Sequence, residues 1–217
     1  MDTLTTACLP LLPDGNDFGS KTPAAYANAE ALPFMQNWVA PGQKPNEGGA
    51  AYVGRTDTAL CFYVWLEDGS IYTTATENNQ QLWTLGDAAE FFIKPGEDRP
   101  DYWEIHVSPN DLLMDIHLPG REAMRTGKFT WDHLIAADSA SWKRVATYPT
   151  DGYWVVELRI PWTTFGYEQA PTPGTTWQYS VSRYNYTGDL EHVEHSAMSP
   201  ITELNFHQYE HFVSVTF

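Results

Sequence analysis

The residues with the clearest chemical potential lie between Trp83 and Leu118, in segments whose side chains alternate between apolar and polar. An acid, Glu90, and an imidazole, His106, take polar positions in two of these segments, and Trp83 precedes the first. Because side chains in a strand point alternately to its two faces, Glu90 and His106 can share one sheet face. An acid, an imidazole and a nearby tryptophan on a sheet surface indicate a ligand site more than a catalytic centre.

The alternation predicts strands at 88–93, 102–108 and 113–118. In the second strand, Trp103, Ile105 and Val107 take one face, and Tyr102, Glu104 and His106 take the other. Alternation with a period of two is typical of half-buried antiparallel strands. Glu90 and Glu104 also offer the two carboxylates that a glycosidase needs, but acids are too frequent in this chain to make that pair specific.

Further segments with strand character follow along the chain, at 31–38, 50–55, 59–66, 128–134, 142–148, 153–160, 177–186 and 212–217. Turn residues separate them, and helical periodicity is almost absent. The pattern predicts an all-β protein, an antiparallel β-sandwich of two sheets with immunoglobulin-like or jelly-roll-like architecture. The 217 residues fit a single domain spanning 1–217, since all-β domains often reach ~200–250 residues.

Composition excludes several function classes. The formal net charge of −16 disfavours binding to nucleic acid or to an anionic membrane surface. No segment reaches the ~18 apolar residues of a membrane-spanning helix, so membrane insertion is not expected. The chain contains 9 Trp and 12 Tyr, which suits a β protein that packs rings in its core or stacks them on flat ligands. We expect a monomer.

Cysteine and histidine usage leaves alternatives open. Cys8 and Cys61 could form a disulfide if the first strand lies beside the segment 59–66. Four histidines near acids in the last quarter of the chain could bind zinc, although their spacing matches no zinc motif; they are His192, His195, His207 and His211. Arg183 has the parity of the apolar face of its strand, which indicates a structural ion pair.

Several motifs follow one another in a characteristic order. They are Asp14-Gly15, the strand 57–64 (DTALCFYV), Trp83 with 87–95 (DAAEFFIKP), 102–109 (YWEIHVSP) with Asp115, 154–162 (WVVELRIPW), 177–183 (WQYSVSR), and 205–207 (NFH) with Phe212. In this order they resemble carbohydrate-binding module family 9, a β-sandwich family related to DOMON-like domains. The resemblance covers nearly the whole chain.

The resemblance implies non-catalytic binding of an oligo- or polysaccharide. Aromatic side chains would clamp a sugar ring, and polar groups on the sheet would hold its hydroxyls. The implied carbohydrate-binding residues are Trp83, Glu90, His106, Ser182 and Phe206, with Tyr184 as a further ring of the platform. The sequence departs from the family pattern: Trp83 lies one residue farther from Glu90, His106 and Ser182 are shorter than expected, and Phe206 replaces a tryptophan.

The resemblance also implies a setting. We expect an extracellular, periplasmic or cell-surface protein of polysaccharide degradation, either stand-alone or attached to a glycoside hydrolase, although no export signal is visible. Structural calcium is implied, and the oxygen-rich turns 14–17 and 67–69 are candidates to bind it.

Three alternatives remain at this stage. A DOMON-like haem or redox domain would need axial ligands facing one pocket, such as Met114 or Met198 with His106 or His207. A structural or interaction domain could have lost its sugar site, and a glycoside hydrolase would turn over sugar substrates.

Overall fold

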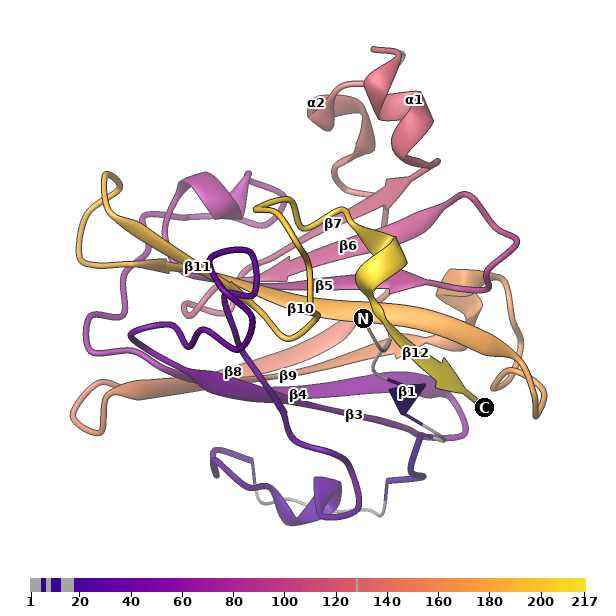
Figure 1. The fold of residues 1–217 in the computed structure, drawn as a ribbon, viewed down its shortest axis with the longest axis horizontal. Coiled ribbons are helices and arrows are strands. Elements are labelled where there is room, and N and C mark those ends of the chain that lie inside the picture. Colours follow the sequence, from indigo (N-terminus) through magenta and orange to yellow (C-terminus); the bar gives the residue numbers. More distant parts are fainter. Residues whose placement is uncertain (1–4, 7–8, 13–17, 128) are drawn as a thin grey trace.

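The computed structural model describes residues 5–6, 9–12, 18–127 and 129–217. Two sheets face each other (Figure 1). The larger sheet contains β1 (Thr5–Thr6), β5 (Ala88–Lys94), β6 (Tyr102–Val107), β7 (Leu113–Leu118), β10 (Thr176–Tyr186), β11 (Val193–Ala197) and β12 (Val213–Thr216). Its order is β1-β12-β10-β5-β6-β7, with β11 paired to β10. The smaller sheet contains β2 (Leu32–Pro33), β3 (Gly49–Arg55), β4 (Ala59–Glu67), β8 (Trp142–Tyr148) and β9 (Tyr153–Pro161), in the order β2-β3-β4-β9-β8.

Pairing within the described strands is antiparallel except between β1 and β12. The prediction of an antiparallel β-sandwich is therefore confirmed. Short helices connect the strands: η1 (Ala24–Tyr26), η2 (Leu82–Thr84), α1 (Arg121–Arg125), α2 (Trp131–Leu134), η3 (Trp162–Phe165) and η4 (Tyr209–His211). None of the described helices is long and apolar enough to cross a membrane.

The main core lies between the sheets and follows from the alternation of each strand. Phe62, Phe91, Trp154, Trp177 and Val181 are among its buried side chains. Phe62 and Phe91 meet edge to face across the two sheets, with ring centroids 5.3 Å apart. Burial of each such side chain contributes roughly 1.5–3 kcal/mol, so the alternating positions fix the register of each strand.

A second apolar cluster covers the outer face of the larger sheet. Phe92, Met114, Ile116 and Leu118 belong to it, together with Phe212 from the C-terminal part of the chain. Figure 1 shows this part crossing over the sheet, while α1 and α2 stand beyond β7. All seven residues of β5 and all six of β6 are consequently buried, so polar side chains on this outer face are enclosed rather than exposed to solvent.

Two of the expected strands are wrong. The segment 31–38 pairs as a strand only at Leu32–Pro33, because the backbone then turns after an isolated bridge at Met35. Within 128–134 the described residues form no strand, and Trp131–Leu134 form the helix α2. Trp131 and Leu134 are three positions apart, a spacing that fits one helical face as well as a short strand, and both side chains pack in or against the outer cluster.

Arg183 forms a structural ion pair, as its inward parity predicts. Its guanidinium is fully buried and donates from Nη2 to Asp68 Oδ2 at 3.2 Å and to Asn185 Oδ1 at 2.7 Å. Its Nη1 donates to the backbone carbonyls of Glu47 and Gly48. Arg183 is therefore the ion-pair partner of Asp68 and not of Glu90.

The cysteine and turn predictions are tested only in part. Cys61 is buried and forms no disulfide with a described residue, while Cys8 lies outside the described residues. The turn 14–17 also lies outside them. In the turn 67–69, both carboxylate oxygens of Asp68 already accept hydrogen bonds, from Ser70 N, Trp154 Nε1 and Arg183 Nη2. Calcium binding stays a prediction.

Candidate functional site

The outer face of the larger sheet carries a row of polar residues across three neighbouring strands. The register pairs Ser182 of β10 with Glu90 of β5, and Glu90 with His106 of β6. Glu104 lies two residues from His106 on the same strand and therefore on the same face. The alternation in the sequence thus brings an acid and an imidazole together, as expected, and adds a second acid beside them.

Glu90, His106 and Glu104 form a close hydrogen-bonded group. His106 Nε2 lies 2.8 Å from Glu90 Oε1 and 2.7 Å from Glu104 Oε1. The three residues are only 3 %, 0 % and 2 % exposed, respectively. Both carboxylates therefore share one side of one imidazole, and all three side chains are almost fully buried.

Burial and the attraction between His106 and the two carboxylates shift the pKa values of these three groups in opposite directions. Burial raises the pKa of Glu90 to about 7, although the neighbouring His106 opposes the shift. Burial alone would lower the pKa of His106, but the two carboxylates outweigh it and raise that pKa to about 9. The pKa of Glu104 is lowered, since its hydrogen bond and attraction to His106 exceed the cost of burial. Near neutral pH the imidazole is therefore positively charged.

A cavity of about 210 Å³ opens over the Glu90 end of this group. Its walls are Glu90, Tyr184, His195, Leu204, Asn205, Phe206 and His207. The rings of Tyr184 and Phe206 meet edge to face, with centroids 5.7 Å apart, and His195 packs against both. The cavity thus combines a carboxylate with several aromatic rings and an amide.

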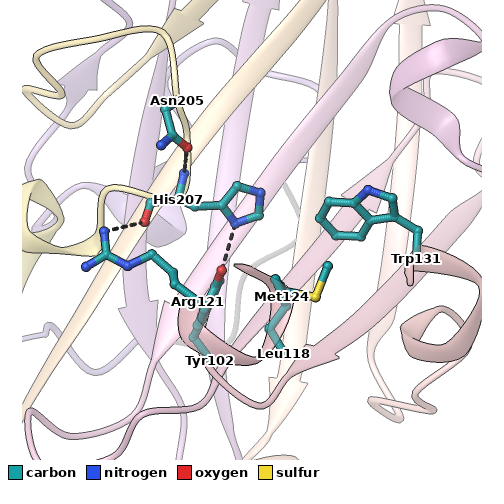
Figure 2. A pocket seen from close by; sticks show the side chains of 7 residues that line it. All are labelled: Tyr102, Leu118, Arg121, Met124, Trp131, Asn205 and His207. Atoms are coloured by element: carbon teal, nitrogen blue, oxygen red, sulfur yellow. Dashed lines mark hydrogen bonds between the residues drawn. The ribbon is translucent and has the colours of Figure 1, made fainter. Parts of the chain in front are cut away.

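A second cavity, of about 230 Å³, adjoins the first through the shared residues Asn205 and His207 (Figure 2). Its other walls are Tyr102, Leu118, Arg121, Met124 and Trp131. His207 is held between the two cavities: its Nδ1 lies 2.8 Å from the Tyr102 hydroxyl, and its carbonyl accepts from Arg121 at 3.3 Å. One wall of this second space is therefore built by Arg121 and Met124 of α1 and Trp131 of α2.

The structure gathers five of the six residues expected to bind carbohydrate, in two different roles. Glu90, Tyr184 and Phe206 line the first cavity, while His106 and Ser182 flank Glu90 beneath it. Phe206 is only 6 % exposed and acts as a wall more than as a free platform. The Ser182 hydroxyl is buried and has no hydrogen-bond partner among the described residues.

Trp83 takes a different place. Its ring packs on His106 with centroids 5.3 Å apart and meets Trp131 edge to face at 5.5 Å. It does not line either cavity. Trp131 lines the second cavity, so an effect of Trp83 on a ligand would pass through Trp131 or His106.

Several cavity residues are not identified by sequence reasoning as ligand contacts: His195, Leu204, Asn205, His207, Arg121, Met124 and Trp131. His195 pairs directly with Tyr184, but it lies on β11, a strand that the sequence pattern does not predict. The residues from the 199–212 segment and from α1 and α2 carry no strand signal either, since their positions depend on how irregular chain covers the sheet.

The four-histidine zinc hypothesis is not supported by the geometry. His195 and His207 both reach the first cavity, but His192 is an exposed partner of Asp189, with Nδ1 3.1 Å from its carboxylate. For the haem alternative, Met198 lies in the core between the sheets and His106 Nε2 is engaged by two carboxylates. Met114 lies in the outer cluster and His207 between the two cavities, so a pair formed by these two residues stays a prediction.

The protonation of His106 predicts a pH dependence of stability. A pKa raised from 6.5 to about 9 means that the folded state holds this proton more tightly than the unfolded state. The resulting stabilisation is complete below pH 6.5 and is lost as the pH rises through 9. We expect the free energy of unfolding to fall by about 1–3 kcal/mol between pH 7 and pH 9, measured by urea denaturation in EDTA.

The matched variant is Glu90→Gln combined with Glu104→Gln, which removes both charges that hold the proton on His106 and should therefore lack most of this slope. Burial also raises the pKa of Asp87 to about 8, so Asp87 contributes a loss over the same window in both proteins. The difference between wild type and this double variant removes that common contribution. Equal slopes in the two proteins would show that the group of Glu90, Glu104 and His106 holds no extra proton in the folded state.

Comparisons with known proteins bear on the fold. No family model matches the chain, and no curated protein matches it. Solved structures do. A protein from Bacteroides uniformis described as a "putative carbohydrate-binding protein" is similar over 99% of both chains, with 16% identity and a TM-score of 0.71.

Two further similar structures are family 9 carbohydrate-binding modules from Caldicellulosiruptor kristjanssonii. The one in complex with cellotriose has a TM-score of 0.64 and 16% identity, over 97% of this chain and 93% of that chain. The one in complex with glucose has a TM-score of 0.60 and 14% identity, over 98% and 93%. The chain thus shares its fold with family 9 modules, in agreement with the motif order.

Proposed function

We propose that this domain binds carbohydrate without chemical turnover, and that a sugar unit occupies the cavity over Glu90. The observation that carries the proposal is the composition of this cavity: a buried carboxylate at its base, with the rings of Tyr184 and Phe206 and the amide of Asn205 around it. Sugars need apolar surfaces for their C–H faces and polar groups for their hydroxyls, and this cavity provides both. The shared fold with sugar-bound family 9 modules supports the same assignment.

Each wall residue has a distinct role in this proposal. Glu90 accepts hydrogen bonds from sugar hydroxyls through its carboxylate, a charge-assisted and therefore strong interaction. His106 and Glu104 hold that carboxylate in place from below. Tyr184 and Phe206 present aromatic surface, and Asn205 adds an amide at the boundary with the second cavity.

The second cavity suits a further sugar unit. It is predominantly apolar, with Trp131, Met124 and Leu118 in its walls, and it shares Asn205 and His207 with the first. An oligosaccharide could therefore extend from one cavity into the other. We expect cellobiose to bind more tightly than glucose, because the second unit buries additional apolar surface.

The proposal extends to the role of the protein in polysaccharide degradation. A domain that binds sugar chains without cleaving them serves polysaccharide degradation as an attached module or as a separate surface protein. We propose such an exported, substrate-targeting role.

Removal of one aromatic wall tests the proposal. We expect Tyr184→Ala to weaken glucose and cellobiose binding by about 10-fold or more in isothermal titration calorimetry, because the buried ring face is lost. The matched control is Trp142→Ala, which removes an aromatic side chain that is 48% exposed on β8 of the smaller sheet. Sugar binding that is unchanged in Tyr184→Ala, or weakened equally in Trp142→Ala, contradicts the proposed location.

A further inference from the structure

The hydrogen-bonded group beneath the cavity also has the composition of a metal site. Glu90, Glu104 and His106 each bring one ligand atom to within 4.8 Å of the other two. They come from adjacent strands whose backbones are fixed by the sheet ladder on both sides. A rigid set of two carboxylates and one imidazole is a donor set that divalent transition metals favour.

The second carboxylate oxygens supply an independent observation. Glu90 Oε2 and Glu104 Oε2 are buried, and no N–H or hydroxyl group of the described residues donates a hydrogen bond to either of them, although the two carboxyl groups lie within hydrogen-bond reach of each other. Buried oxygens of charged groups without donors are rare, because each loses its hydration without replacement. Two carboxylates facing one imidazole also leave an excess of negative charge even when the imidazole is protonated. A cation held between the two acids would satisfy both the oxygens and the charge.

His207 offers a fourth ligand from the cavity side. Its Nε2 lies 3.9 Å from Glu104 Oε2, while its Nδ1 is 2.8 Å from the Tyr102 hydroxyl. Metal-binding histidines almost always donate their other ring N–H to a second group, which fixes the tautomer and the ring orientation. In the tautomer with the proton on Nδ1, Tyr102 accepts that hydrogen bond and the Nε2 of His207 beside Glu104 is free to bind a metal.

We infer that Glu90, Glu104 and His106 bind a single Zn²⁺ ion in place of the proton that the acids share with His106, and that His207 moves in from beside Glu104 as the fourth ligand. Two imidazoles and two carboxylates suit four-coordinate zinc, whereas calcium and magnesium prefer ligand sets made of oxygen alone. Zinc ligands at about 2.0–2.1 Å in a tetrahedron lie about 3.3 Å apart. The present separations of 2.7 and 2.8 Å therefore require each carboxylate oxygen to move roughly half an ångström away from His106 Nε2, while the strand backbones stay in place.

The test uses the whole chain, stripped of metal with EDTA, then incubated with Zn²⁺ and desalted. We expect one Zn²⁺ to be retained per chain. Co²⁺ supplied instead of Zn²⁺ should give the visible absorption of a four-coordinate ion. Glu104→Gln removes a ligand that does not line the sugar cavity and should weaken binding at least about 100-fold. Tyr102→Phe should weaken it by about 10-fold through the loss of the hydrogen bond to His207. His192→Ala, at the exposed pair with Asp189, should bind as wild type does.

The inference is overturned if wild type retains no ion, if Co²⁺ gives a six-coordinate spectrum, or if Glu104→Gln binds as tightly as wild type. Where Glu104→Gln does not fold, Tyr102→Phe decides, and unchanged affinity there overturns the inference. Metal binding and sugar binding are separable: Tyr184→Ala should retain zinc while losing sugar.

Discussion

Glucose affinity is expected to fall by about 10- to 100-fold when Glu90 is replaced with glutamine. Hydrogen bonds to a charged group contribute about 1.5–3 kcal/mol, and the amide keeps the shape of the side chain while losing the charge. Because burial raises the pKa of Glu90 to about 7, the titration belongs at pH 8, where the wild-type carboxylate is ionised. Isothermal titration calorimetry at that pH gives the affinity ratio directly.

The control for this prediction is Glu191→Gln, which removes the same charge from an exposed position in the turn between β10 and β11. Its glucose affinity should equal that of wild type. A thermal denaturation of both variants checks that the fold is intact. If Glu90→Gln binds glucose as wild type does while remaining folded, Glu90 does not contact the sugar.

A loss of about 3–5 kcal/mol in the free energy of unfolding is expected for Asp68→Ala. Asp68 is the acid that faces the fully buried guanidinium of Arg183, and it also accepts a hydrogen bond from Trp154 Nε1 at 3.1 Å. Removal of one partner leaves the other charge buried without compensation, which costs far more than the pair itself contributes. Urea denaturation at pH 7 measures the change.

Glu122→Ala provides the comparison. Glu122 pairs with Arg125 at 2.8 Å on the surface of α1, where both side chains are largely exposed. Exposed pairs contribute about 0–1 kcal/mol, so this variant should unfold almost as wild type does. A similar loss in the two variants would mean that the Asp68–Arg183 pair is not enclosed as described.

The sequence predicts the sandwich well where strands obey strict alternation. The strands from Ala88 to Leu118, and those at β9 and β10, appear at nearly the expected positions, because each must bury one face between the sheets. The inward placement of Arg183 follows from the same parity argument. The segment containing Trp131 was misassigned because seven residues are too few to separate a strand from one turn of helix.

In the candidate site too, residues on regular strands could be predicted from the sequence, and residues on irregular chain could not. Glu90 and His106 could be placed on one sheet face from parity, whereas Ser182 was implied only by the resemblance to family 9; the register of the sheet brings the three together. Glu104 belonged to the same face and could have been added to them. His207 and Trp131 could not, because they lie on irregular chain whose path over the sheet is set by packing in the outer cluster.

The central claim is that sugar binds over Glu90 on the outer face of the larger sheet. The most direct measurement is an NMR titration of the ¹⁵N-labelled protein with cellotriose, followed through the assigned backbone amides. We predict saturable shifts concentrated at Glu90, Tyr184, Asn205 and Phe206, with none at Trp142 on the opposite sheet. Shifts confined to other surfaces, or no shifts at millimolar cellotriose, would contradict the account.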